Sequence, residues 1–100
     1  MVTHGDKEKN MSWKDLCLTA NIEILKKAVL KENERQLEKW GVQNVSPFEW
    51  MTYLVEEVGE LAEAISEAEY RKGTFDDIYK EAIQVATLAL KIAEITGVRK

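Results

Sequence analysis

The only proline of the chain stands in the strongest helix-start signal of the sequence. Ser46 precedes Pro47, and Glu49 follows two residues later. Serine is a preferred N-cap, proline suits the first helical position, and a glutamate three residues after the serine completes a capping box. We therefore predict a helix that begins here and continues to about Tyr70. One face of it is marked by apolar residues at helical spacing: Leu54, Val58, Leu61 and Ile65.

Two further helices are predicted on either side of this one. Apolar residues recur three or four apart over residues 12–40, and Gly41 stops that pattern. Residues 31–35 are polar on all sides, so the first helix should bend or be exposed there. The third helix follows Thr74 or Asp76, carries acids in its first turn, and runs to Thr96.

The composition agrees with an all-helical chain. One proline and five glycines in 100 residues do not favour a turn-rich β-sandwich or barrel. The length suits a single domain, and 45% hydrophobic with 32% charged residues is typical of a globular one. We expect an all-α antiparallel bundle of three main helices over residues 12–100, after a flexible lead-in at residues 1–11.

Charge and cysteine content limit the partners and the compartment. A formal net charge of -4 argues against a general nucleic-acid-binding surface. No apolar run approaches the roughly 18 residues of a membrane span, and the polar N-terminus is unlike a signal peptide. The single cysteine, Cys17, excludes an internal disulfide and fits a reducing compartment. We expect a cytoplasmic protein without nucleic-acid or membrane partners.

The third helix is unusually apolar for a small monomer. Its apolar residues cover more than half of the circumference: Ile78, Ala82, Val85, Ala86, Leu88, Ala89, Leu90, Ile92 and Ala93. A helix in a three-helix monomer buries about one stripe. We therefore expect a homodimer or homotetramer with this helix at its centre.

The second helix contains a cluster of acids in the sequence EEVGE, residues 56–60. Residues three apart share a helix face, so Glu57 and Glu60 project together at the edge of the apolar stripe. Glu56 lies further round, nearer to solvent. The same spacing also arises on an ordinary solvated face, so it does not by itself establish a metal site.

The third helix adds another carboxylate in apolar surroundings. Glu81 falls between Ile78 and Val85, and a lone charge there would be costly unless paired with a lysine or bound to a metal. Gln84, one turn further on, offers an amide oxygen. Carboxylate and amide oxygens match Mg²⁺ or Mn²⁺. The only histidine, His4, lies near the N-terminus, which disfavours zinc and di-iron sites.

Two segments of the chain together resemble a known family. RQLEKWGVQNVSPFEWMTYLVEEVGELAEAI, followed by EAIQVATLALKIAE, is similar to the MazG-like all-α nucleoside triphosphate pyrophosphohydrolases. That family resembles the dimeric dUTPases in fold and converts NTPs or dNTPs to monophosphate and pyrophosphate with Mg²⁺. The resemblance implies that Glu57, Glu60 and Glu81 are catalytic magnesium ligands and that Glu56 assists them.

The chain departs from the family pattern at two points. The second motif of the family is usually ExxD, and Gln84 stands where the aspartate is expected. An amide binds Mg²⁺ less tightly than a carboxylate, so a second metal would be weak or absent. Longer members also use a fourth helix for phosphate contacts. In this chain those contacts would come from Lys39, Lys80, Lys91 or another subunit.

Four residues are candidates for a nucleobase pocket: Trp40, Gln43, Asn44 and Trp50. Indole rings can stack on a base, and amide groups can read its edge. The alternative is that the tryptophans are core anchors and the amides are loop residues. The sequence also leaves two other functions open, a non-catalytic helical dimer of the same fold and a module that presents its first helix to a partner.

Overall fold

The computed structural model describes residues 18–98, which form three α-helices and one π-helical turn. The elements are α2 (Leu18–Trp40), α3 (Pro47–Tyr70), α4 (Phe75–Ala93) and η1 (Glu94–Val98). No strand occurs among these residues, which confirms the predicted all-α class with three packed helices. The expected lead-in at residues 1–11 and the expected helix start at Ser12 lie outside the described residues.

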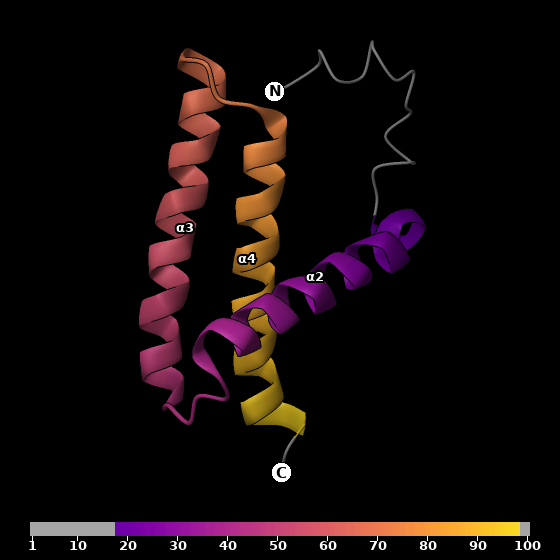
Figure 1. Ribbon diagram of the computed structural model, residues 1–100, viewed down its shortest axis with the longest axis vertical. Helices are drawn as coiled ribbons and strands as arrows, with labels where there is room; N and C mark the ends of the chain where they lie inside the picture. Colours follow the sequence, from indigo (N-terminus) through magenta and orange to yellow (C-terminus); the bar gives the residue numbers. More distant parts are fainter. Residues whose placement is uncertain (1–17, 99–100) are drawn as a thin grey trace.

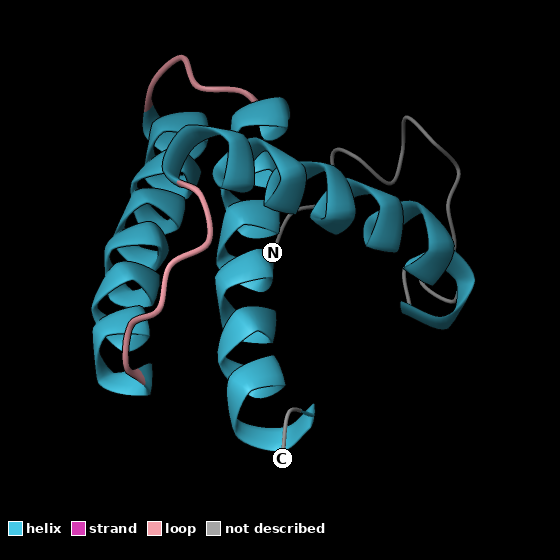
Figure 2. Cartoon of the chain, turned by 60° about the horizontal axis from the view of Figure 1, so that its bottom comes forward, coloured by secondary structure: helices cyan, strands magenta, loops and turns pink. Residues whose placement is uncertain are grey.

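The helix α4 is the central element of the structure. It runs antiparallel to α3 as the second arm of a hairpin, and α2 crosses it obliquely (Figure 1). Figure 2 shows the same crossing from another side, with α2 lying over one end of the hairpin. The predicted antiparallel arrangement thus holds for α3 and α4, whereas α2 departs from the hairpin axis.

Local hydrogen bonds fix the starts of α3 and α4 where the sequence predicts them. The backbone N–H of Glu49 donates to Ser46 Oγ (3.2 Å), and the N–H of Ser46 donates to Glu49 Oε1 (3.0 Å). At α4, the N–H of Asp77 donates to the hydroxyl of Thr74 (3.2 Å). Both caps satisfy amide groups that have no partner within the helix.

Two glycines make the chain reversals possible. Gly41 ends α2 with φ +72°, a conformation that glycine adopts without steric cost, and its N–H donates to the carbonyl of Leu37 (2.8 Å). Gly73 follows α3, where an added Cβ would lie 2.8 Å from the Cβ of Glu67. Only glycine allows so close an approach between the loop and the helix.

Few hydrophobic side chains are fully covered within this single chain. Among the described residues, the buried apolar side chains are Trp50 on α3 and Leu88 on α4. Thr87, next to Leu88 on α4, is also buried, and its hydroxyl donates to the carbonyl of Ile83 (2.8 Å). Leu88 therefore belongs to the core of the protomer. The rest of the apolar arc predicted for α4 is half-buried or exposed in the single chain, with Ala89, Leu90 and Ala93 exposed, so a partner at this helix stays a prediction.

The helix α3 carries two apolar faces instead of one. Its inner face packs on α4 and includes Trp50, Leu54, Leu61 and Ala64. Its outer face is exposed and includes Phe48, Met51, Val55, Val58 and Ile65. The apolar stripe predicted from the sequence divides between them, because Val58 and Ile65 remain 47% and 46% exposed.

No helix within residues 18–98 combines the length and the apolar character needed to cross a bilayer.

Candidate metal centre and adjoining cavity

Three carboxylates converge where α3 faces α4. Glu57 and Glu60 come from α3, Glu81 comes from α4, and one oxygen of each lies within 4.8 Å of the others. Glu57 and Glu60 are one turn apart on the same helix face, and the antiparallel hairpin brings Glu81 opposite them. Glu57 and Glu81 are half-buried, and Glu60 is exposed. The structure therefore brings together the three carboxylates that the sequence proposed as metal ligands.

Burial and the neighbouring negative charges raise the pKa values of two of these acids. Burial raises the pKa of Glu57 to about 7, and the charges of Glu60 and Glu81 add to the effect. Burial and the charge of Glu60 also raise the pKa of Glu81. The charged forms of these groups repel one another, and a divalent cation among them would remove that repulsion.

Gln84 bridges two of the three carboxylates. In the amide orientation that satisfies its hydrogen bonds, its NH₂ group donates to Glu57 Oε1 (2.7 Å) and Glu81 Oε1 (3.1 Å). The nitrogen of Gln84, and not its oxygen, then faces the cluster. The metal-ligand role predicted for its oxygen would require the amide to turn over.

The donor set fits a hard divalent cation. All three groups are carboxylates, the oxygen ligands that Mg²⁺ and Mn²⁺ prefer. The alternative prediction for Glu81 was a salt bridge to a lysine. Within residues 18–98, none of the three carboxylates forms a salt bridge, and Lys91 instead donates to Gln36.

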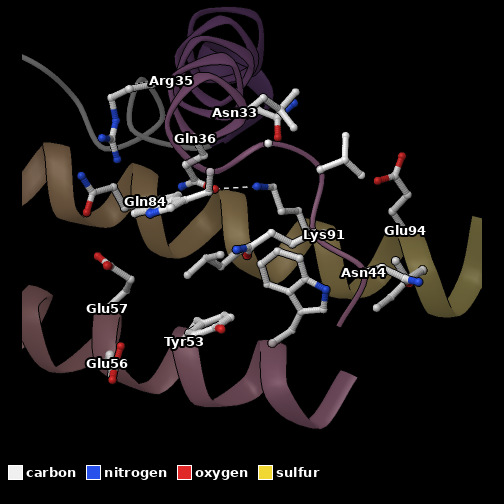
Figure 3. A pocket seen from close by; sticks show the side chains of 18 residues that line it. Asn33, Arg35, Gln36, Asn44, Tyr53, Glu56, Glu57, Gln84, Lys91 and Glu94 are labelled. Atoms are coloured by element: carbon white, nitrogen blue, oxygen red, sulfur yellow. Dashed lines mark hydrogen bonds between the residues drawn. The ribbon is translucent and has the colours of Figure 1, made fainter. Parts of the chain in front are cut away.

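A cavity of about 670 Å³ adjoins the carboxylate cluster (Figure 3). It lies between the end of α2, the loop that follows, the start of α3 and the end of α4. Glu56, Glu57 and Gln84 line one end of it. All four residues predicted for a nucleobase pocket also line this cavity: Trp40, Gln43, Asn44 and Trp50. Trp50 serves the core as well, since it is only 8% exposed.

A chain of hydrogen bonds forms one wall of the cavity. Gln36 is buried, its amide nitrogen donates to Glu32 Oε2 (2.7 Å), and its oxygen accepts from Lys91 Nζ (2.5 Å). Arg35 donates twice to the carboxylate of Glu32 (2.9 and 2.7 Å). Burial alone would raise the pKa of Glu32, but the bonds from Arg35 and Gln36 hold it below the usual value. The network joins α2 to α4 across the cavity.

Aromatic rings and cations occupy the same region. The rings of Trp50 and Tyr53 meet edge to face with centroids 5.8 Å apart. Lys91 Nζ lies 5.4 Å from the Trp50 ring, and Lys39 Nζ lies 4.8 Å from the Trp40 ring. Of the three lysines proposed for phosphate contacts, Lys91 alone lines the cavity, whereas Lys39 and Lys80 are exposed.

Sequence reasoning missed several residues that line or support the cavity, namely Glu32, Arg35, Gln36 and Tyr53. The stretch 31–35 was expected to bend or to be exposed; α2 runs through it without interruption, and Lys31, Glu34 and Arg35 are exposed. Glu32 and Asn33 are half-buried and Gln36 is buried. A signal was present, because these positions continue the helical spacing of Leu25, Ala28 and Val29 on the covered face of α2.

Comparison of the chain with models of known families, with curated proteins and with solved structures finds no match.

We expect the stability of the metal-free protein to fall as the pH rises from 5 to 8. Glu57 has a pKa of about 7 in the folded chain, and its ordinary value is 4.5. Between these two pH values the folded state therefore binds more protons than the unfolded state. The stabilisation is present at low pH and is lost as the pH passes through 7. Glu57→Gln should flatten this part of the profile of the thermal midpoint, measured by calorimetry in EDTA.

The matched control for this pH profile is Glu63→Gln, an exposed glutamate on the same helix. It should keep the wild-type slope. Binding of Mg²⁺ should release protons below pH 7, because the metal takes the deprotonated carboxylate. Identical slopes in wild type and Glu57→Gln would contradict the assignment.

Proposed function

We propose that the chain is an Mg²⁺-dependent nucleoside triphosphate pyrophosphohydrolase, which converts an NTP or dNTP to the monophosphate and pyrophosphate. The observation that carries this proposal is the position of Glu57, which belongs both to the carboxylate cluster and to the cavity wall. A nucleotide with its base in the cavity would have its phosphates beside the cluster. The resemblance to the MazG-like family agrees with this arrangement.

The dimensions and lining of the cavity suit a nucleoside. Pockets for small ligands commonly have volumes of about 300–1,000 Å³, and this cavity has about 670 Å³. Its aromatic rings offer stacking surfaces, and Gln43 and Asn44 offer amide groups for a base edge. Arg35 lies on the side of the cavity near Glu57, where phosphate charge would be placed.

In the proposed reaction, water attacks the triphosphate and the bond between the α- and β-phosphates breaks. Glu57, Glu60 and Glu81 would hold Mg²⁺ or Mn²⁺, which supplies charge neutralisation and orients the leaving pyrophosphate. Glu56, which is outside this set of three metal ligands, would orient the water and accept its proton; if Glu60 is not engaged with the metal, it could take this role instead. Glu56 suits this role because it is exposed and lines the cavity.

The direct test is pyrophosphate release from a panel of NTPs and dNTPs with Mg²⁺, with EDTA as the control. Metal-dependent release of pyrophosphate supports the proposal. Release from none of them, in a folded protein, would favour the non-catalytic helical dimer. Binding of a protein partner that persists in EDTA would favour an interaction module.

Gln84→Asp distinguishes an active site from a vestigial one. The change removes the amide that donates to Glu57 and Glu81 and adds a fourth acid. The thermal midpoint in EDTA should therefore fall by several degrees, since carboxylates then face one another without a donor. In an active site the added charge should tighten Mg²⁺ binding about tenfold, as measured by calorimetric titration.

Gln84→Asn is the control for this substitution, because it shortens the side chain equally and adds no charge. It should weaken the fold without any gain in Mg²⁺ affinity. Loss of stability in Gln84→Asp with unchanged Mg²⁺ affinity would contradict the enzyme assignment.

We also propose that the chain forms a homodimer through the outer face of α3. This face consists of three rows of residues seven apart, all exposed: Phe48, Val55 and Ala62; Met51, Val58 and Ile65; Thr52, Gly59 and Ser66. None of these nine residues is charged, and the first charge in the rows is the exposed Glu69, seven residues after Ala62 and next to the end of α3. A repeat of this kind is typical of helices that pack along a seam, and the small third row permits close approach of a second helix.

A further inference from the structure

The amine of Lys91 is the feature of the cavity that the proposed chemistry does not use. Lys91 stands on α4, and Figure 3 shows its side chain directed into the cavity toward Gln36. Its Nζ donates to Gln36 Oε1 (2.5 Å) and lies 5.4 Å from the ring centroid of Trp50. It therefore lies over the ring of Trp50, in the wall of the cavity that the proposed base would enter.

The ammonium group of Lys91 has hydrogen-bond donors that the described part of the chain does not use. A lysine ammonium has three N–H donors, and one of them is used by Gln36. The structure gives Lys91 no second hydrogen-bond acceptor among residues 18–98. Gln36 cannot reverse its amide to help, because its nitrogen already donates to Glu32 (2.7 Å). Two N–H donors of Lys91 are therefore left for an acceptor on the ligand, while the charges of Glu32 and Glu94 also act on this amine.

We infer that the cavity selects nucleobases that present a carbonyl oxygen to Lys91. Guanine and hypoxanthine carry the relevant oxygen at C6, and uracil and thymine carry it at C4, whereas adenine and cytosine carry an amino group at these positions. An amino group would place a donor against the donor of Lys91 and leave both unsatisfied. The inference rests on the proposed function and specifies its substrate class.

The experiment compares pairs of nucleotides that differ at this position. Inosine triphosphate and ATP form one pair, and UTP and CTP form the other. The ratio of kcat/KM within each pair should favour the carbonyl base by about 10- to 100-fold, the effect of one hydrogen bond to a charged group. Lys91→Met should bring both ratios close to one, since methionine keeps an apolar chain over Trp50 and has no donor.

Two further variants control for folding and for loss of charge. Lys91→Arg retains donors and should keep a preference for the carbonyl bases. Lys27→Met removes an exposed lysine of α2 outside the cavity and should leave the ratios unchanged. Each variant is checked by its thermal midpoint with and without Mg²⁺, which reports the fold and the metal site separately from base selection.

Each result of the experiment bears on the inference. Ratios near one in the wild-type protein would overturn it, whether or not Lys91→Met folds, and pyrophosphate release would leave the proposed function intact. A preference that persists in folded Lys91→Met would overturn the role of Lys91. If no nucleotide is hydrolysed, the proposed function fails. Binding of inosine and adenosine monophosphates, followed by tryptophan fluorescence, then decides the inference, and equal affinities overturn it.

Discussion

Glu81→Gln should lower kcat/KM for pyrophosphate release by about 10²- to 10³-fold and abolish the rise of the thermal midpoint in Mg²⁺. Glu81 is the carboxylate that α4 contributes to the cluster, so the metal loses its link between the two helices. In EDTA the same variant should be more stable than wild type. The substitution removes a half-buried charge that repels Glu57 and Glu60.

The loss of stabilisation by Mg²⁺ together with the gain of stability in EDTA distinguishes loss of the metal site from loss of the fold. A misfolded variant would lose stability with and without Mg²⁺, whereas a variant that lacks only a metal ligand would gain stability in EDTA. Glu60→Gln should behave in the same way. Glu63→Gln, on α3 but outside the cluster, should keep wild-type activity and wild-type stabilisation by Mg²⁺. Wild-type activity in both Glu60→Gln and Glu81→Gln would contradict the site.

Short-range signals made the starts of α3 and α4 predictable, whereas the third helix, expected to run to Thr96, ends as an α-helix at Ala93 and continues as a π-helical turn. The capping box at Ser46 and the cap at Thr74 depend on residues within one turn, and both form as expected.

The direction of α2 was not predictable in the same way. It depends on how α2 packs on α4, where Gln36 accepts from Lys91, a residue 55 positions away. Helical spacing places Gln36 on the face of Leu25, Ala28 and Val29, but it does not give the angle at which that face meets α4.

The candidate site shows the same division between local and long-range information. Helical spacing predicted that Glu57 and Glu60 share a face, and the apolar neighbours of Glu81 correctly placed it toward α3. The orientation of the Gln84 amide was not predicted, because its partners come from both helices. Arg35 was missed for a related reason, since it reaches the cavity only because α2 crosses α4.

Val55→Lys should convert a homodimer to a monomer. Val55 is 60% exposed in the single chain, in the middle of the outer face of α3. A lysine there should therefore have little effect on the protomer itself. In a dimer whose two α3 helices pack about a two-fold axis, the substitution would bring two lysines together at an apolar seam. The dissociation constant should rise by at least about 100-fold, since a charge buried without a partner costs several kcal/mol.

Light scattering at micromolar concentration measures this change directly. The wild-type protein should have twice the 11.5 kDa mass of one chain, and the Val55→Lys variant should have the mass of a single chain. Glu34→Lys is the matched control, because it introduces the same side chain at an exposed position of α2, outside the outer face of α3. It should remain dimeric. A monomeric wild-type protein would contradict the interface, and a Val55→Lys dimer would shift it to another apolar surface, such as that of Leu18, Ile22 and Ile24 on α2.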